Sequence, residues 1–178
     1  MTTISEIYPG NRVTLREVGL RDGLQLVKKY PSTAAKVDWI DCEFAAGVRH
    51  FEVGSFLPAS RMPQFADVRE LIAAVDRHQG VFSSALALNE RGAADALETN
   101  VDEIVCIVSS TEAHSQANMR RSRSDAVELV RKVVELRDAS DKNPVVNAGI
   151  AMAFGCSIAG NVSQSEVIGL AEKCLEAG

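Results

Sequence analysis

The chain has 178 residues, of which 46% are hydrophobic and 24% are charged, and its formal net charge at pH 7 is −5. This composition is typical of a folded globular domain and excludes an intrinsically disordered chain. The negative charge, without a long stripe of Lys and Arg, argues against a general nucleic-acid-binding protein. No apolar run reaches membrane-spanning length, so no membrane partner is expected.

Four cysteines are widely spaced and include no Cys-x-x-Cys pair. Neither a zinc site nor a disulfide framework is indicated, and reduced thiols are expected. The first ten residues show no pattern of a targeting peptide, so we expect a cytoplasmic protein. Three of the cysteines lie in apolar surroundings typical of small core residues, whereas Cys156, between Gly155 and Ser157, could instead face a site.

Strand-like and helix-like segments alternate along the chain. Short apolar or alternating runs predict strands, and amphipathic segments with capping residues predict helices. The expected strands are residues 13–16, 48–53, 81–88, 103–108 and 145–154. The expected helices run from Ser32 or Thr33 to Gly47, over 68–75, after Asn89, over 124–136, and from a capping box of Ser163 and Glu166 to Gly178. A long loop is expected at residues 109–122.

These segments make up a βα unit repeated five times, at a spacing of roughly thirty to thirty-five residues. Such alternation implies a parallel sheet with right-handed crossovers. Two architectures fit, an open doubly wound sheet or part of a closed (β/α)₈ barrel. Glycine-rich phosphate fingerprints are missing from the expected strand ends, which weakens the nucleotide-binding version. No linker divides residues 1–178, so a single domain is expected.

The stretch from Val13 to Gln25 reads VTLREVGLRDGLQ and places Arg21 and Asp22 in a turn after the first expected strand. Ligands of parallel α/β sheets bind where strands end, because side chains from several loops converge there. An aspartate beside a guanidinium suits a hard divalent cation held next to an oxyanion. The same dipeptide could also be an ordinary ion pair in a turn.

The residues from Glu17 to Gln25 resemble the opening signature of hydroxymethylglutaryl-CoA lyase, within the superfamily of metal-dependent barrels that cleave or form carbon–carbon bonds. The similarity continues through residues 52–67, the segment with Asn118 and Ser122, and residues 154–163. The resemblance implies a TIM (β/α)₈ barrel of which about five units are present. Three units, with a pair of metal-binding histidines, a catalytic aspartate and a glycine-rich loop with a cysteine, would lie outside this N-terminal portion.

The resemblance also implies roles for individual side chains. Asp22 would be a ligand of Mg²⁺ or Mn²⁺, and Arg21 would bind substrate and donate to the developing enolate oxygen. Glu52 would be catalytic beside the metal, unless it is a half-buried carboxylate paired with a Lys or Arg of the barrel. Gln25 and Ser55 would position the substrate or the backbone, although each could be a turn residue.

The segment after the fourth expected strand carries further candidates. Asn118 and Ser122 would contact substrate, or else be loop and helix-start residues. The cluster of Arg120, Arg121 and Arg123 is either a solvated loop or a site for a CoA phosphate. His114 is expected to be a polar loop residue, and the other two histidines, His50 and His78, are expected at the surface.

Together these features predict an enzyme that cleaves a 3-hydroxy-3-methylglutaryl-CoA-like acyl-CoA into acetyl-CoA and a keto acid. Leu20, Leu26 and Val27 depart from the usual lyase pattern and leave the acyl group open. A Claisen-condensing synthase of the isopropylmalate or homocitrate type is an alternative, and a non-catalytic half-barrel binding module is another. An open barrel segment exposes edge strands and an apolar face, so we expect a homo-oligomer, a dimer, and doubt that the 178 residues alone are active.

Overall fold

The computed structural model describes residues 3–11 and 13–178 of the protein. Its strands are parallel and are hydrogen-bonded in the order β1-β2-β3-β4. They are β1 His50–Ser55, β2 Phe82–Leu86, β3 Glu103–Ser109 and β4 Val145–Ala151. The helices are α1 Ile4–Ile7, α2 Thr33–Ala45, α3 Val68–Val75, α4 Glu90–Leu97, α5 Glu112–Met119, α6 Arg123–Asp138 and α7 Gln164–Glu176. Two short turns are η1 Gly19–Gly23, a π turn, and η2 Pro63–Phe65, a 3₁₀ turn.

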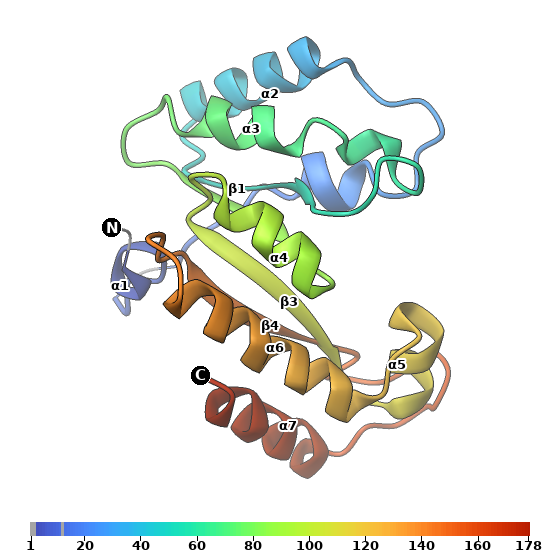
Figure 1. Ribbon diagram of the computed structural model, residues 1–178. Coiled ribbons are helices and arrows are strands. Elements are labelled where there is room, and N and C mark those ends of the chain that lie inside the picture. The colour runs from blue at the N-terminus through green and yellow to red at the C-terminus, as the bar shows by residue number, and fades with distance from the viewer. Residues whose placement is uncertain (1–2, 12) are drawn as a thin grey trace.

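The strands follow one another across the sheet in chain order, with helices in every crossover. Helix α3 joins β1 to β2, α4 joins β2 to β3, and α5 and α6 join β3 to β4. In Figure 1 the larger helices follow one another in front of the sheet, from α2 at the top to α7 at the bottom. Doubly wound sheets reverse their strand order, whereas a (β/α)₈ barrel keeps chain order with its helices outside. The topology therefore favours the barrel.

The core lies between the sheet and the helices. Ile104, Cys106 and Val108 of β3 are fully buried, and they belong to the same cluster as Leu129 and Val133 of α6. Alternate strand residues point to opposite faces, so this row faces the helices and the intervening residues face the barrel interior. Burial of the helix-facing row, at about 25 cal/mol per Å² of apolar surface, holds each crossover helix against its strands.

The prediction of a first strand at residues 13–16 is wrong. Only Glu17 pairs with β1, as a bridge to Phe51 in parallel register, and Val13 and Leu15 are 88% and 81% exposed. This register places residues 13–15 before the beginning of β1. No neighbouring strand is therefore available to them within the described parts of the chain, and a strand without a hydrogen-bonded neighbour does not form.

Four further expectations need correction. The expected loop at residues 109–122 contains α5, which Thr111 caps by accepting from the His114 amide at 3.3 Å. The last strand ends at Ala151 rather than residue 154, because Met152 has a left-handed φ of 61°. His50 is buried rather than at the surface, and of the three supposed core cysteines Cys42 is exposed.

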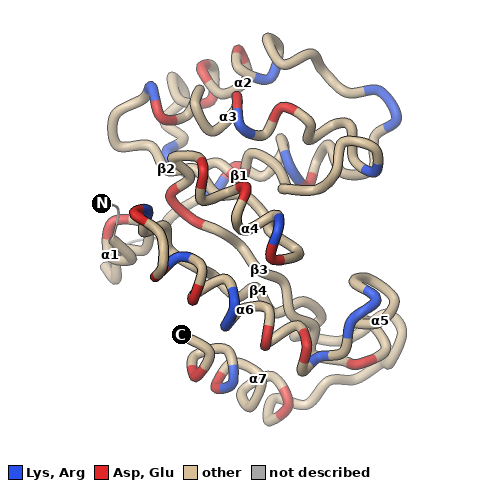
Figure 2. The backbone as a smooth tube through the Cα atoms, in the orientation of Figure 1, with Lys and Arg blue, Asp and Glu red and all other residues tan. Residues whose placement is uncertain are grey.

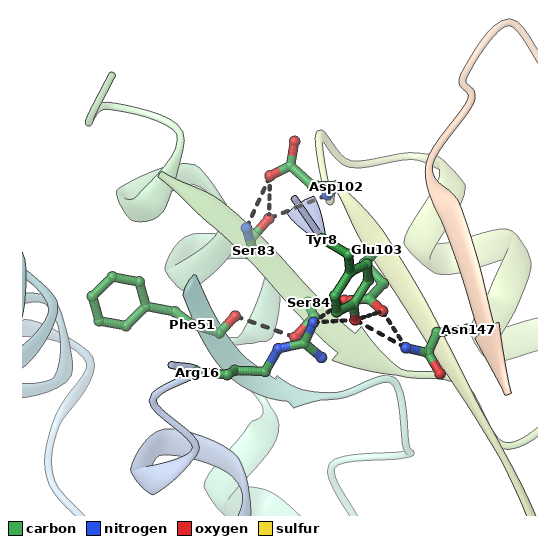
Figure 3. Close-up of polar contacts among 8 residues, drawn as sticks. All are labelled: Tyr8, Arg16, Phe51, Ser83, Ser84, Asp102, Glu103 and Asn147. Atoms are coloured by element: carbon green, nitrogen blue, oxygen red, sulfur yellow. Dashed lines mark hydrogen bonds and ion pairs between the residues drawn. The ribbon is translucent and has the colours of Figure 1, made fainter. Parts of the chain in front are cut away.

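Polar side chains close the barrel interior at the N-terminal ends of the strands (Figure 3). The Glu103 carboxylate, 1% exposed, pairs with Arg16 and accepts hydrogen bonds from the Tyr8 hydroxyl and the Asn147 amide, both at 2.6 Å. Tyr8 follows α1, so the N-terminal segment covers this end of the sheet. Each carboxylate oxygen has a donor, as a buried acid requires. These contacts belong to the scaffold and leave the opposite strand ends for a ligand.

Candidate active site

The turn η1 presents Arg21 and Asp22 at the C-terminal end of the sheet. The Val18 carbonyl accepts the backbone N–H groups of Arg21, Asp22 and Gly23 at 3.1, 2.7 and 3.3 Å. A Cβ atom on Gly19 would lie 2.6 Å from Cζ2 of Trp39 in α2, so only glycine allows the turn to pack this closely. The backbone that carries the two charged residues is therefore held both by its own hydrogen bonds and by α2.

The Arg21 guanidinium joins three of the predicted site residues. Its Nε donates to the Glu52 carboxylate, and its Nη1 donates to Oδ1 of Asp22 and Oε1 of Gln25, both at 3.0 Å. Glu52 lies on β1, so the guanidinium links the turn to the sheet. Within the described residues, Nη2 has no hydrogen-bond partner. The structure thus brings together Arg21, Asp22, Gln25 and Glu52, and it leaves a donor of the guanidinium open.

Burial differs sharply across this cluster. The side chains of Glu52 and Arg21 are 7% and 18% exposed, whereas that of Asp22 is 64% exposed. The pairing of Glu52 with an arginine agrees with the alternative interpretation of this residue, and its partner is the arginine expected to act on substrate. A carboxylate locked to one edge of a guanidinium fixes the plane of the donors, which suits recognition of an oxyanion.

Asp22 is the one predicted metal ligand among the described residues of this cluster. Asp22 offers a hard oxygen ligand at an exposed position, and Oδ2 of its carboxylate makes no hydrogen bond to the residues that the structure describes. Those residues contain no group of three or more His, Cys, Asp or Glu side chains placed to hold a metal ion. Asp22 therefore fits the role of a single ligand, and the remaining ligands are not found among the described side chains.

Three other predicted site residues make no hydrogen bond to this cluster within the described parts of the chain. Ser55, 2% exposed at the end of β1, donates to the Leu86 carbonyl at 3.4 Å and so contacts backbone. Asn118 is exposed on α5 rather than in a loop. Ser122 is the N-cap of α6 and accepts from the Asp125 amide at 3.0 Å. Arg120 is the C-cap of α5 and Arg123 is the first residue of α6, and Figure 2 shows basic residues along this junction.

Cys156 is held in the loop after β4. Its Sγ lies 3.1 Å from Oγ1 of Thr111 and accepts the backbone N–H groups of Ile158 and Ala159 at 3.4 and 3.3 Å. The hydrogen bond with Thr111, followed by that from Ala159, lowers the pKa of the Cys156 thiol. The side chain is buried. That Cys156 faces a ligand stays a prediction.

The sequence pattern alone predicts no role for Glu17, although this residue lies in the motif of residues 17–25. Its carboxylate accepts the N–H of Gly19, and its backbone pairs with β1 on both sides, from Glu17 N to His50 O and from Glu52 N to Glu17 O, each at 2.8 Å. Its position four residues before Arg21 and two before Gly19 was the available signal. Glu17 connects the turn to the sheet and thereby sets where the guanidinium lies.

Two cavities on the described surface have volumes of about 460 and 480 Å³. The first lies at the N-terminal ends of the strands beside His50 and Phe82, and the second lies between α3 and α4 beside Arg69. Neither is lined by the Arg21 cluster, which instead forms an open surface. Among residues 3–11 and 13–178, no helix combines the length and apolar character needed to cross a bilayer.

The strand order defines part of a (β/α)₈ barrel, and the guanidinium–carboxylate cluster lies at the ends of the strands where barrel enzymes carry their active sites. A protein-family model described as HMGL-like matches residues 12–178. The chain belongs to this HMGL-like family. The resemblance found in the sequence is thereby confirmed, and so is the barrel fold for about five βα units.

Curated relatives include the hydroxymethylglutaryl-CoA lyase YngG of Bacillus subtilis, 33% identical over 171 residues that make up 96% of this chain and 56% of the relative. The 3-hydroxy-3-isohexenylglutaryl-CoA/hydroxy-methylglutaryl-CoA lyase of Pseudomonas aeruginosa is 36% identical over 94% of this chain and 55% of the relative. The chain spans about half the length of these relatives.

Solved structures agree with this assignment. A hydroxymethylglutaryl-CoA lyase from Pseudomonas aeruginosa superposes with a TM-score of 0.86 at 35% identity, covering 94% of this chain and 55% of that one. An HMG-CoA lyase from A. baumannii, solved in complex with coenzyme A and 3-methylmalate, gives a TM-score of 0.84 at 30% identity and covers 100% of this chain and 56% of that one.

Proposed function

We propose that the protein is a metal-dependent carbon–carbon lyase that cleaves a 3-hydroxy-3-methylglutaryl-CoA-like thioester into acetyl-CoA and a keto acid. The observation that carries the proposal is the Arg21 guanidinium, held by Glu52 and Gln25 beside an exposed Asp22, in a chain of the HMGL-like family. This chain contributes one wall of the site, and the family relatives extend over about twice its length.

The residues fit the steps of a retro-Claisen cleavage. A base removes the proton of the substrate hydroxyl, the carbon–carbon bond breaks, and its electron pair passes into the enolate of acetyl-CoA, which then takes up a proton. A divalent cation held by Asp22 and by ligands from outside this chain would lower the pKa of the substrate hydroxyl. The described residues contain no assigned base for that proton.

Arg21 has the chemistry to stabilise the enolate. Its Nη2 is a permanent donor whose direction is set by the salt bridge from Nε to Glu52. A donor already fixed in place costs little reorganisation when negative charge develops on the thioester oxygen. Glu52 acts by holding the guanidinium, and the side chain of Gln25 accepts a hydrogen bond from Nη1. Ser55, Asn118 and Ser122 remain proposed substrate contacts with no measured link to this cluster.

An activity assay tests the proposal directly. The purified protein is incubated with 3-hydroxy-3-methylglutaryl-CoA and Mg²⁺ or Mn²⁺, and acetyl-CoA is quantified by chromatography. Arg21→Lys keeps the charge but removes the planar fork, so kcat falls about 10²- to 10³-fold, as for loss of an oxyanion donor. Arg69→Lys, on the exposed face of α3, is the matched control and keeps full activity.

The alternatives give different outcomes in the same assay. A condensing synthase releases free CoA from acetyl-CoA and a 2-oxo acid, and cleaves no hydroxy acyl-CoA. A non-catalytic half-barrel, which the shortage of metal ligands in the described residues favours as second candidate, binds acyl-CoA without turnover. Folded protein that releases no acetyl-CoA with either metal refutes the lyase proposal for this polypeptide.

A further inference from the structure

Residues 25–29, which follow the turn η1, lie outside the helices and strands. Within the described parts of the chain they receive one hydrogen bond from a residue distant in sequence, which runs from Nε2 of Gln64 to the backbone carbonyl of Gln25 at 2.9 Å. Gln64 lies in η2 and is 6% exposed. A buried amide without a hydrogen bond lowers the stability of the folded protein. The bond from Gln64 to the Gln25 carbonyl is therefore expected to persist.

Gln64 is itself held by a buried ion pair. Its backbone carbonyl accepts from Nζ of Lys36 at 2.7 Å, and the same ammonium donates to both carboxylate oxygens of Asp67 at 2.8 and 3.0 Å. Lys36 is 1% exposed, and Thr33 donates to Asp67 at 2.9 Å. All three ammonium donors are therefore used, and η2 is fixed to α2 by contacts that have little freedom to shift.

The hydrogen bonds continue from this anchor to the guanidinium. The backbone of Gln25 is held by Gln64, and its side-chain Oε1 accepts from Nη1 of Arg21 at 3.0 Å. One hydrogen of Nη1 serves Gln25 and the other serves Asp22, at 3.0 Å. If the Gln25 carbonyl were released, its exposed side chain would sample other rotamers, and the guanidinium could turn about its bond to Glu52.

We infer that Gln64 is a positioning residue for Arg21, acting through Gln25. It fixes the backbone of Gln25, whose side chain accepts one hydrogen of Nη1, and so maintains the orientation of the guanidinium and of its open Nη2 donor. The inference rests on the proposed lyase function for its catalytic consequence, but the geometric link between Gln64 and Arg21 stands without it. Within the described residues Gln64 makes no hydrogen bond to Arg21 itself, so its effect on the guanidinium passes through Gln25.

Kinetics of Gln64→Met test this role, because methionine keeps the length of the side chain and removes the donor. We expect kcat to fall about tenfold with KM for the acyl-CoA nearly unchanged, since the guanidinium acts on charge that develops in the transition state. Gln164→Met, an exposed glutamine on α7, is the matched control and leaves both constants unchanged. A structural role would instead lower the folded fraction at constant kcat per folded molecule.

A double-mutant cycle separates action through Gln25 from any other effect. Gln25→Met removes the acceptor for Nη1 at an exposed position, so this variant is expected to fold. In that background Gln64→Met should cause no further loss of kcat. An equal fractional loss in both backgrounds, or no loss in the wild type, overturns the inference. If Gln64→Met does not fold, Gln64→Asn replaces it, because the shorter amide cannot reach the carbonyl.

A spectroscopic readout keeps the two proposals distinguishable. The Nη1–H resonances of Arg21, identified by their loss in Arg21→Lys, should exchange slowly with solvent in the wild type and in Gln164→Met, and faster in Gln64→Met, because Gln25 accepts from Nη1. Unchanged exchange refutes the positioning role whether or not the protein cleaves acyl-CoA. Absence of cleavage with the expected change in exchange refutes the proposed function and leaves the positioning role in place.

Discussion

Removing the charge of Glu103 should destabilise the protein strongly without touching the candidate site. Glu103 is 1% exposed and receives donors from Arg16, Tyr8 and Asn147 at the N-terminal ends of the strands (Figure 3). The substitution Glu103→Gln keeps the shape of the side chain. It replaces one acceptor oxygen by an NH₂ group, which must then face another donor.

The magnitude follows from these contacts. A hydrogen bond to a charged group contributes about 1.5–3 kcal/mol, and breaking a buried ion pair by removing one partner costs about 3–5 kcal/mol. The amide can keep two of the three contacts at most, so we expect a loss of about 3 kcal/mol in the free energy of unfolding. For a chain of this size that corresponds to a fall of about 6–12 °C in Tm.

Urea denaturation followed by far-UV circular dichroism measures this loss, with a thermal scan as a second readout. The matched control is Glu172→Gln on α7, an exposed glutamate that undergoes the same change of charge, and it should shift the unfolding free energy by less than about 0.5 kcal/mol. Equal shifts in the two variants would refute the view that the buried cluster, rather than overall charge, stabilises the scaffold.

Three further changes have defined outcomes. Gly19→Ala should lower the free energy of unfolding, measured in urea, by about 1–3 kcal/mol and reduce acyl-CoA cleavage, because the added Cβ lies 2.6 Å from Trp39. Burial, and then the hydrogen bond to the nearby carboxylate, raise the pKa of Tyr8; wild-type stability should fall as pH rises above about 10, and less so in Tyr8→Phe. Burial raises the pKa of Cys106 to about 12, so iodoacetamide at pH 8 should label exposed Cys42 first, as peptide mass spectrometry would show.

Features set by local sequence could be predicted. The N-caps are examples: Ser32 accepts from the Ala35 amide at 3.3 Å, Asn89 accepts from the Gly92 amide at 2.7 Å, and the capping box of Ser163 and Glu166 is present. Each depends on residues within one turn of helix, so the pattern carries the information. The motif likewise placed Arg21 and Asp22 correctly in a turn at the end of the sheet.

Features set by distant contacts could not be predicted from the pattern. Residues 13–16 alternate like a strand, but the parallel bridge between Glu17 and Phe51 leaves residues 13–15 before the beginning of β1. Helix α5 has little apolar periodicity, so its sequence reads as a loop. The contact between Gln64 and Gln25 joins residues 39 apart in sequence, and only the packing of η2 against α2 brings them together.

The two ends of the sheet use similar chemical groups for different purposes. At the N-terminal ends, the Glu103 carboxylate has a donor on each oxygen and is 1% exposed, so its contacts are closed. At the C-terminal ends, the Glu52 carboxylate also pairs with an arginine, but Arg21 keeps Nη2 open and Asp22 is 64% exposed. A closed cluster can be optimised for stability alone, whereas an open one must keep unsatisfied donors for a ligand. Substitutions at Glu103 should therefore change the unfolding free energy at unchanged kcat per folded molecule. Arg21→Lys, which keeps a cation beside the buried Glu52, should instead lower kcat with a smaller change in the unfolding free energy.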